Sequence, residues 1–196
     1  MSLKLTNPKF KKEGEDAECS SWPSMEEETR EIYLIGTVGD EAASAIIPAI
    51  RHLDQTRGMV TFIMSSTGGD VDAGFAIYDA INLMRNKTIC YAYGTCMSMA
   101  AFILQACDKR YLSPNCRFMI HNGVMSIDCG YDEGMSLTKE IELLNDIVLD
   151  ILAKRATISI NKIKNMCLKT KFMSASEACL AGFADGILEV PRRRKW

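Results

Sequence analysis

The sequence of 196 residues predicts one α/β domain built around a parallel β-sheet. Short, almost continuously apolar segments alternate with segments whose apolar residues recur every three or four positions. That order is typical of parallel strands and of the helices that cover both faces of their sheet. The length suits one domain that buries roughly 70% of its unfolded surface, so its core needs no disulfide support.

The expected elements follow a polar start. Residues 1–29 carry clustered charges without a sustained period, which predicts a flexible arm. Apolar segments bounded by glycine, proline or polar residues predict strands at residues 31–35, 59–64, 88–93, 110–112, 117–120 and 186–190. Helical spacing predicts helices at residues 40–53, 75–84, 98–106, 136–154 and from about 175 to Gly182.

Local signals refine three of these helices. Asp40 is the expected N-cap of the first, and Pro48 inside it predicts a kink because proline lacks an N–H and crowds the preceding turn. Ser174 and Glu177 have the spacing of a capping box at the start of the last helix. The helix at 136–154 is apolar over more than one stripe, which predicts a subunit interface.

Composition excludes several classes of protein. The net charge of -2, from 23 Lys and Arg against 25 Asp and Glu, gives no reason to expect a nucleic-acid or membrane partner. No apolar run approaches the roughly 18 residues of a membrane span, and no secretory signal is evident. The expected location is therefore the cytoplasm, with an organelle as the alternative. The 8 cysteines include no C-x-x-C pair and there are only 2 histidines, which favours free buried thiols and predicts no metal or other cofactor.

Two predicted strand-to-helix junctions carry residues with catalytic potential. The pair Gly68-Gly69 can present backbone N–H groups at the start of one helix. Ser98 is the first residue of the next predicted helix, so its hydroxyl lies beside the free N–H groups there. If the junctions are neighbours, the N–H groups of Gly69 and Met99 can hold an oxyanion beside a nucleophilic Ser98. His121 ends a strand and is the candidate base. A plain helix cap and a structural histidine are the alternative, and the residue types leave both open.

Several short motifs occur together in one known family. They are Ser66-Thr67-Gly68-Gly69, Ala73-Gly74, Ile77-Tyr78-Asp79, Ser98-Met99-Ala100-Ala101-Phe102, Lys109-Arg110-Tyr111, Pro114-Asn115, Arg117-Phe118-Met119-Ile120-His121 and Phe172-Met173-Ser174-Ala175. In this order, from about residue 30 to 190, they resemble the Clp protease proteolytic subunit, ClpP. The resemblance implies a ClpP/crotonase-like fold, a stacked parallel sheet with flanking helices and a long protruding handle helix. It assigns residues 30–190 to a peptidase domain, and composition adds the flexible arm at 1–29 before it and a basic, solvated tail at 191–196 after it.

The same resemblance implies a serine endopeptidase. Ser98 would be the nucleophile, His121 the general base, and the Gly69 and Met99 amides the oxyanion hole. Subunits of this family self-associate into heptameric rings that stack as a tetradecamer around a chamber, and the helix at 136–154 would join the rings. Unfolded protein would be delivered by an ATP-driven AAA+ unfoldase, and short peptides would be cut without it.

The third member of the catalytic triad departs from the family pattern. Counting back from Phe172 places the family aspartate on Thr170, which carries no charge, between Lys169 and Lys171. An aspartate there would fix the tautomer of the imidazole and stabilise the imidazolium, and the two lysines act against that charge. Other departures are Thr67 in place of a proline, Asn122-Gly123 in place of Gln-Pro, and Met125-Ser126 in place of a glycine pair.

Three functions are therefore compared. The first is a ClpP-like endopeptidase subunit that is weak or conditionally active because of Thr170, with Glu177 as another carboxylate that would serve His121 after rearrangement. The second is a catalytically impaired structural subunit that forms a mixed ring with an active ClpP paralogue. The third is a crotonase-type acyl-CoA enzyme, which also uses two backbone amides as an oxyanion hole but needs no Ser–His pair.

Overall fold

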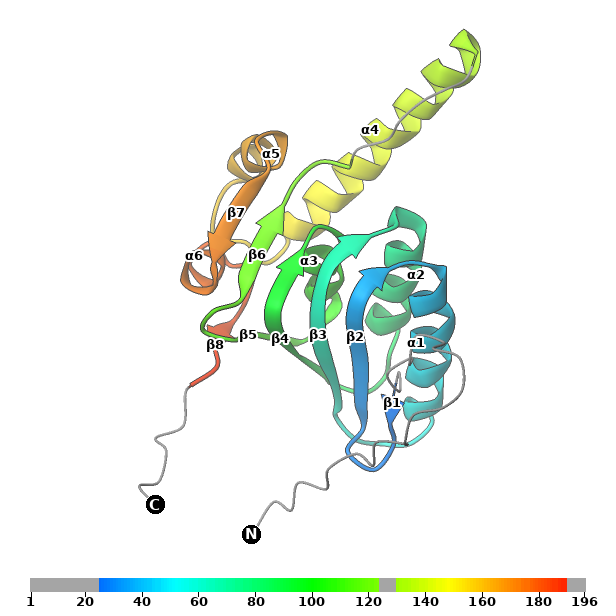
Figure 1. Cartoon of the computed structure of the whole chain (residues 1–196), viewed down its shortest axis with the longest axis vertical. Coiled ribbons are helices and arrows are strands. Elements are labelled where there is room, and N and C mark those ends of the chain that lie inside the picture. Colours follow the sequence, from blue (N-terminus) through cyan, green and yellow to red (C-terminus); the bar gives the residue numbers. More distant parts are fainter. Residues whose placement is uncertain (1–24, 124–129, 190–196) are drawn as a thin grey trace, which may run out of the picture.

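The computed structural model describes residues 25–123 and 130–189 of the chain, and its centre is an eight-stranded sheet (Figure 1). Its path is β1-β2-β3-β4-β5-β8, with β6 beside β4 and β7 beside β6. The strands are β1 (Met25–Glu26), β2 (Glu31–Val38), β3 (Val60–Gly69), β4 (Thr88–Met97), β5 (Lys109–Leu112), β6 (Arg117–Ile120), β7 (Lys171–Ser174) and β8 (Gly186–Ile187). Of the described strand pairs, β1–β2 and β6–β7 are antiparallel and the rest are parallel. The predicted fold class, α/β with a largely parallel sheet, is confirmed.

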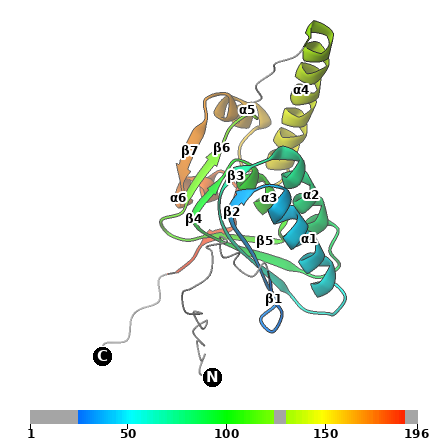
Figure 2. The same cartoon turned by 45° about the vertical axis from the view of Figure 1, so that its right-hand side comes forward.

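The helices divide into two groups. The helices α1 (Asp40–Leu53), α2 (Val71–Asn82) and α3 (Met99–Ile103), the last continued by the 3-10 helix η1 (Leu104–Ala106), pack along one face of the sheet (Figures 1 and 2). The long helix α4 (Tyr131–Ala153) projects from this body, while α5 (Ile160–Leu168) and α6 (Ala175–Leu180) lie at the end of the sheet formed by β6 and β7. Part of α4 therefore has no neighbour within the described chain.

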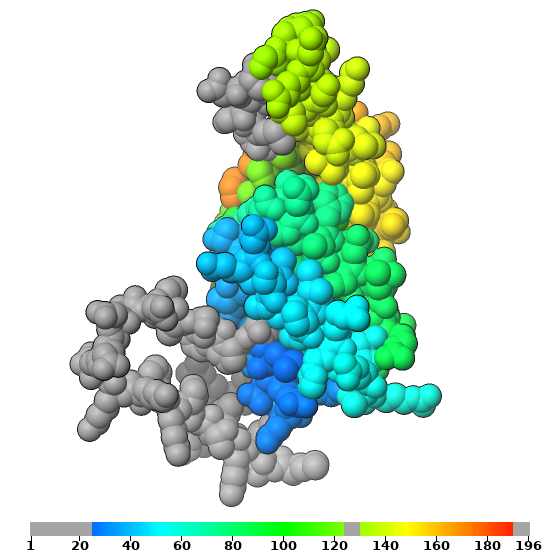
Figure 3. Space-filling model, turned by 90° about the vertical axis from the view of Figure 1, so that its right-hand side faces the viewer, coloured from blue at the N-terminus to red at the C-terminus, as the bar shows by residue number. Residues whose placement is uncertain are grey.

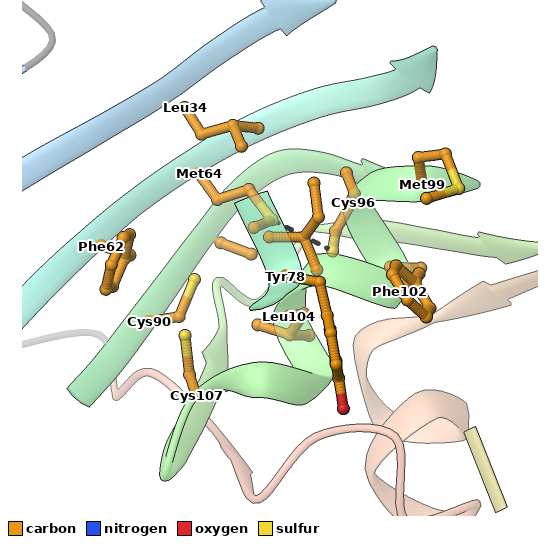
Figure 4. Packing of buried hydrophobic residues seen from close by; sticks show 14 of the residues in the cluster. Leu34, Phe62, Met64, Tyr78, Cys90, Cys96, Met99, Phe102, Leu104 and Cys107 are labelled. Carbon is orange, nitrogen blue, oxygen red and sulfur yellow. Dashed lines mark hydrogen bonds between the residues drawn. The ribbon is translucent and has the colours of Figure 1, made fainter. Parts of the chain in front are cut away.

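The core lies between the sheet and these helices. Leu34 and Met64 of the strands, Tyr78 of α2 and Phe102 of α3 belong to one buried apolar cluster, part of which Figure 4 shows. The rings of Tyr78 and Phe102 stack with their centroids 4.5 Å apart. This packing holds α2 and α3, and with them the turns that begin both helices, against the sheet.

The described cysteines are free, as predicted, and all but Cys179 are buried. Burial raises the pKa of the Cys116 and Cys167 thiols to about 11 and that of Cys96 well above its ordinary value. These thiols are therefore protonated at neutral pH and behave as small apolar core residues. Cys19 and Cys129 lie outside the described residues.

Several boundaries differ from the predicted ones. The strand β4 continues through Gly94, whose φ of +64° accommodates an irregularity in its pairing with β3, and β3 itself runs on to Gly69. The N-cap of α1 is Gly39, not Asp40, and α1 runs through Pro48 as one helix. The capping box between Ser174 and Glu177 is confirmed.

Two further elements were not predicted. The helix α5 has only nine residues and was missed, although Ile160, Ile163 and Cys167 recur at helical spacing and Ser159 caps it by accepting from the Lys162 N–H. The strand β1 pairs with β2 inside the predicted arm, so regular structure begins before residue 30. Residues 1–24 of the arm and the 191–196 tail lie outside the described residues. No helix of the described part is both long and apolar enough to cross a membrane.

A buried ion pair fastens β5 to the β8 end of the sheet. Arg110 is only 2% exposed, and its guanidinium donates to Asp185 Oδ1 at 2.8 Å and to Oδ2 at 3.3 Å. Arg155, which follows α4, donates to both oxygens of the same carboxylate at 3.0 Å. Burial by itself would raise the pKa of Asp185, but the hydrogen bonds and charges of the two arginines outweigh it and lower the pKa.

The substitution Asp185→Asn is expected to lower the free energy of unfolding by about 2 kcal/mol at pH 7, because it leaves the buried Arg110 charge without its partner. A carboxylate with a lowered folded-state pKa stabilises the fold above its unfolded pKa of about 3.9, and that contribution is lost as the pH falls through the folded value. Urea unfolding between pH 3 and 7 should therefore show a steeper acid loss for the parent than for the variant. Asp79→Asn, on the exposed face of α2, is the control, and equal pH profiles for all three proteins would contradict the prediction.

Candidate active site

Ser98 and His121 meet at the carboxyl ends of two neighbouring strands. β4 and β6 are parallel, with Met97 opposite Met119, and the Ser98 N–H donates to the Met119 carbonyl at 2.9 Å. Ser98 directly follows β4 and His121 directly follows β6. Their side chains form a hydrogen bond, with Ser98 Oγ 2.7 Å from His121 Nε2. The sheet thus joins a hydroxyl and an imidazole that are 23 residues apart in sequence.

The Ser98 side chain does not serve as a helix cap. Although Ser98 occupies the N-cap position of α3, its hydroxyl makes no capping hydrogen bond and is bonded to His121 instead. Its backbone has φ +53° and ψ -124°, a strained conformation for a residue with a side chain. Strain of this kind persists only where the surroundings enforce it, and it often accompanies functional sites. The plain-cap interpretation is therefore not supported.

Gly68 and Gly69 bring the first junction into contact with the second. Gly68 has φ +95°, and a Cβ there would lie 2.6 Å from Ser98 Cβ and 2.9 Å from the Met99 nitrogen. Gly69 has φ +154°, and its Cβ would lie 2.0 Å from the Val38 carbonyl oxygen. Only glycine permits this backbone approach. The N–H groups of Gly69 and Met99 are consequently on adjacent segments beside Ser98.

The Ser98–His121 pair opens onto a cavity of about 660 Å³, which Gly69 and Met99 also line. Most of the apolar side chains of its wall come from α3, β6 and α4, among them Met99, Phe102, Ile120, Ile141, Leu144 and Val148. An extended chain with apolar side chains could be held there. A second cavity of about 670 Å³, between the α1–β3 and α2–β4 loops, contains none of the predicted site residues.

Thr170 directly precedes β7 as His121 directly follows β6, and no hydrogen bond joins their side chains. The antiparallel pairing ends with Ile120 opposite Lys171, so His121 and Thr170 are the residues that flank the last pair of this ladder. Thr170 has φ +49°, which is unfavourable for a β-branched residue. Within the described residues, the only hydrogen bond of the His121 ring is the one to Ser98.

Glu177 does not face His121. Its Oε2 accepts from the Ser174 backbone N–H at 2.8 Å and from the Ser174 hydroxyl at 2.9 Å, and these bonds lower the pKa of Glu177. Lys171 Nζ lies 4.0 Å from its other oxygen. The Glu177 carboxylate is therefore already hydrogen-bonded to Ser174 at the start of α6.

One contact beside the site was missed in the sequence. The Gly123 N–H, two residues after His121, donates to Asn145 Oδ1 of α4 at 3.0 Å. No motif marks Asn145, because the contact depends on how α4 packs rather than on local spacing. The departures at Met125 and Ser126 lie outside the described residues.

No group of three or more His, Cys, Asp and Glu residues in the described ranges is arranged to hold a metal ion. His52, the other histidine, lies far along the chain in α1, where it is half-exposed and its Nε2 is 3.1 Å from Glu27 Oε1. The chemistry of the site therefore has to be argued from Ser98, His121 and the backbone around them.

Two comparisons with known proteins agree with this geometry. The family model described as Clp protease matches residues 14–191. The chain is also 31% identical over 175 residues to an ATP-dependent Clp protease proteolytic subunit from Carsonella ruddii (strain PV), an alignment that covers 85% of this chain and 86% of the relative. The match includes part of the segment before residue 30, where the motifs themselves give little resemblance. By both comparisons, the chain belongs to the Clp protease (ClpP) family.

Proposed function

We propose that this chain is a serine endopeptidase subunit that cleaves unfolded proteins and peptides. Ser98 is the nucleophile, His121 the general base, and the Gly69 and Met99 N–H groups form the oxyanion hole. The observation that carries the proposal is the 2.7 Å contact between Ser98 Oγ and His121 Nε2 at the edge of the cavity of about 660 Å³.

The reaction follows the usual order for such a pair. His121 Nε2 accepts the hydroxyl proton as Ser98 Oγ attacks the substrate carbonyl, and the two N–H groups stabilise the negative oxygen that forms. His121 then donates the proton to the leaving amine, and the peptide bond breaks. A water molecule, deprotonated by the same ring, hydrolyses the acyl-enzyme and regenerates Ser98.

We expect the activity to be weak or conditional. Thr170 supplies no carboxylate opposite His121, and Lys169 and Lys171 flank it with positive charge. An imidazolium forms during the attack, and nearby cations disfavour it. Activity would then depend on how well other contacts hold the ring in place.

The assembly and partners are proposed from the family. The relative is named as the proteolytic subunit of an ATP-dependent protease, and for this chain we propose stacked heptameric rings supplied with unfolded protein by an AAA+ unfoldase. The projecting part of α4, visible in Figure 3, supports this because it exposes the apolar side chains Met135, Leu143 and Ile147. Burying these residues requires another subunit.

A catalytically impaired subunit of a mixed ring is the second candidate. It is favoured by Thr170, which makes no hydrogen bond to the His121 ring in the described part of the chain. In that case a stable tetradecamer should form only when an active ClpP paralogue is co-expressed. A crotonase-type acyl-CoA enzyme would leave the bond between Ser98 and His121 without a role, so that alternative gains no support.

Labelling with a fluorophosphonate tests the first proposal. The assembled protein should be labelled at Ser98, and Ser98→Ala should lower both labelling and peptide cleavage by about 1,000-fold or more, because the nucleophile is lost. Ser113→Ala, in the turn between β5 and β6, is the matched control and should behave like the parent. A parent particle that neither labels nor cleaves peptides would contradict the peptidase proposal and favour the second candidate.

A further inference from the structure

We propose that Asn145 is a positioning residue that holds His121 in place through the backbone of Gly123. The inference rests on the proposed peptidase function. Asn145 lies on α4, the helix that forms one wall of the cavity, and both Asn145 and Gly123 line this cavity together with Ser98 and His121.

The backbone that follows His121 is held from two sides. The Asn122 N–H donates to the Cys167 carbonyl at the end of α5, at 3.2 Å, and the Gly123 N–H donates to Asn145 Oδ1 at 3.0 Å. Before His121, the β6 strand is paired with both β4 and β7. Among the described residues, the Asn145 bond is thus the one hydrogen bond by which a side chain of α4 holds the segment directly after β6.

The sequence of this chain makes the bond possible. The family motif resembled by this segment has proline where Gly123 stands, and proline has no N–H to donate. Gly123 is not needed for its conformational freedom, because it does not adopt a left-handed φ, and a Cβ there would lie in ordinary contact, 3.7 Å from Asn145 Oδ1. What Gly123 adds relative to proline is therefore the donor, and Asn145 is the acceptor that uses it.

The bond matters because few contacts orient the His121 ring itself. Within the described residues, its ring is bonded only to Ser98, and Thr170, opposite it, leaves the remaining ring nitrogen without an orienting group. The position of the ring then depends on the backbone that carries it. A shift of about 1 Å in a reacting group can lower a rate about 100-fold.

Four substitutions in the full-length assembled protein separate the bond from other effects. Asn145→Leu removes the acceptor at nearly constant volume, and Asn145→Asp keeps an Oδ acceptor. Gly123→Pro removes the donor, and Gly123→Ala keeps it. We expect Asn145→Leu and Gly123→Pro each to lower kcat about 10-fold with KM changed less than 2-fold, while Asn145→Asp and Gly123→Ala stay within about 3-fold of the parent.

The double variant tests whether the two residues act as one unit. Asn145→Leu combined with Gly123→Pro should lower kcat no further than either single change, since both remove the same bond. The thermal unfolding midpoints should remain similar, which excludes general misfolding. Multiplicative losses in the double variant, or a parental kcat for Asn145→Leu, would overturn the inference.

Hydrogen–deuterium exchange gives a readout that does not require peptidase activity. The peptide that contains Gly123 should exchange its amide several-fold faster in Asn145→Leu than in the parent, and Asn145→Asp should restore the slow rate. Unchanged exchange would overturn the inference whatever the activity. Faster exchange in a protein that never labels at Ser98 would contradict the proposed function but would still show that the bond between Asn145 and Gly123 holds this backbone.

Discussion

Replacing Thr170 with aspartate is expected to raise the kcat of peptide cleavage by about 100-fold or more. Residue 170 and His121 flank the last pair of the β6–β7 ladder, so we expect a carboxylate at 170 to accept from the ring nitrogen that is not bonded to Ser98. It would fix the tautomer that leaves Nε2 free to accept the Ser98 proton, and it would stabilise the imidazolium. Lys169 and Lys171 would remain, and their charge favours an ionised aspartate.

Thr170→Asn is the matched control for this gain. Asparagine, like aspartate, tolerates the left-handed φ of +49° better than a β-branched residue does, so both variants should gain about 1 kcal/mol in unfolding free energy. Only the aspartate adds a negative charge. Steady-state peptide cleavage and urea unfolding of the three proteins separate the two effects. Equal kcat values for the aspartate and asparagine variants would show that charge at this position is not what the site lacks.

Gly68→Ala should both destabilise the fold and disable the site. The added methyl group would lie 2.6 Å from Ser98 Cβ and 2.8 Å from the Met97 carbonyl oxygen, closer than these atoms can approach. Either Ser98 moves away from His121 or the two strands separate. We expect a loss of about 3 kcal/mol or more in unfolding free energy and at least a 100-fold lower rate of Ser98 labelling.

Gly36→Ala isolates the conformational part of that loss. Gly36 has φ +98°, almost the same as Gly68, but a Cβ there meets nothing within 4 Å. This variant should lose only about 1–2 kcal/mol and should label at the parental rate. Chemical denaturation and fluorophosphonate labelling of both variants provide the comparison. If the two variants lose equal stability and both label normally, the close approach of the two junctions is not essential.

Much of the fold could be predicted because its signals are local. Short stretches of neighbouring residues specify the apolar strands, the helical spacing of α2 and the capping box of α6. The predictions failed where the signal is weak or depends on pairing. The helix α5 has only nine residues, so its helical spacing of Ile160, Ile163 and Cys167 was overlooked, and β4 continues through Gly94 because its ladder with β3 tolerates an irregularity there. Gly39 rather than Asp40 caps α1, since the chain enters that helix one residue earlier than the side chains suggest.

The candidate site, like the fold, could be predicted only in part from the sequence. The sequence alone determined the family and named the candidate site residues, because Ser98, His121 and the paired glycines stand in motifs whose order identifies the family. Only the tertiary structure decided that the Ser98 hydroxyl is bonded to the imidazole rather than capping α3, that Glu177 is occupied by Ser174, and that Asn145 reaches Gly123. The physical reason is that a motif specifies residue types over a short span of chain. Whether two distant groups lie within hydrogen-bonding distance depends on strand register and on the packing of α4, to which many residues contribute a little each.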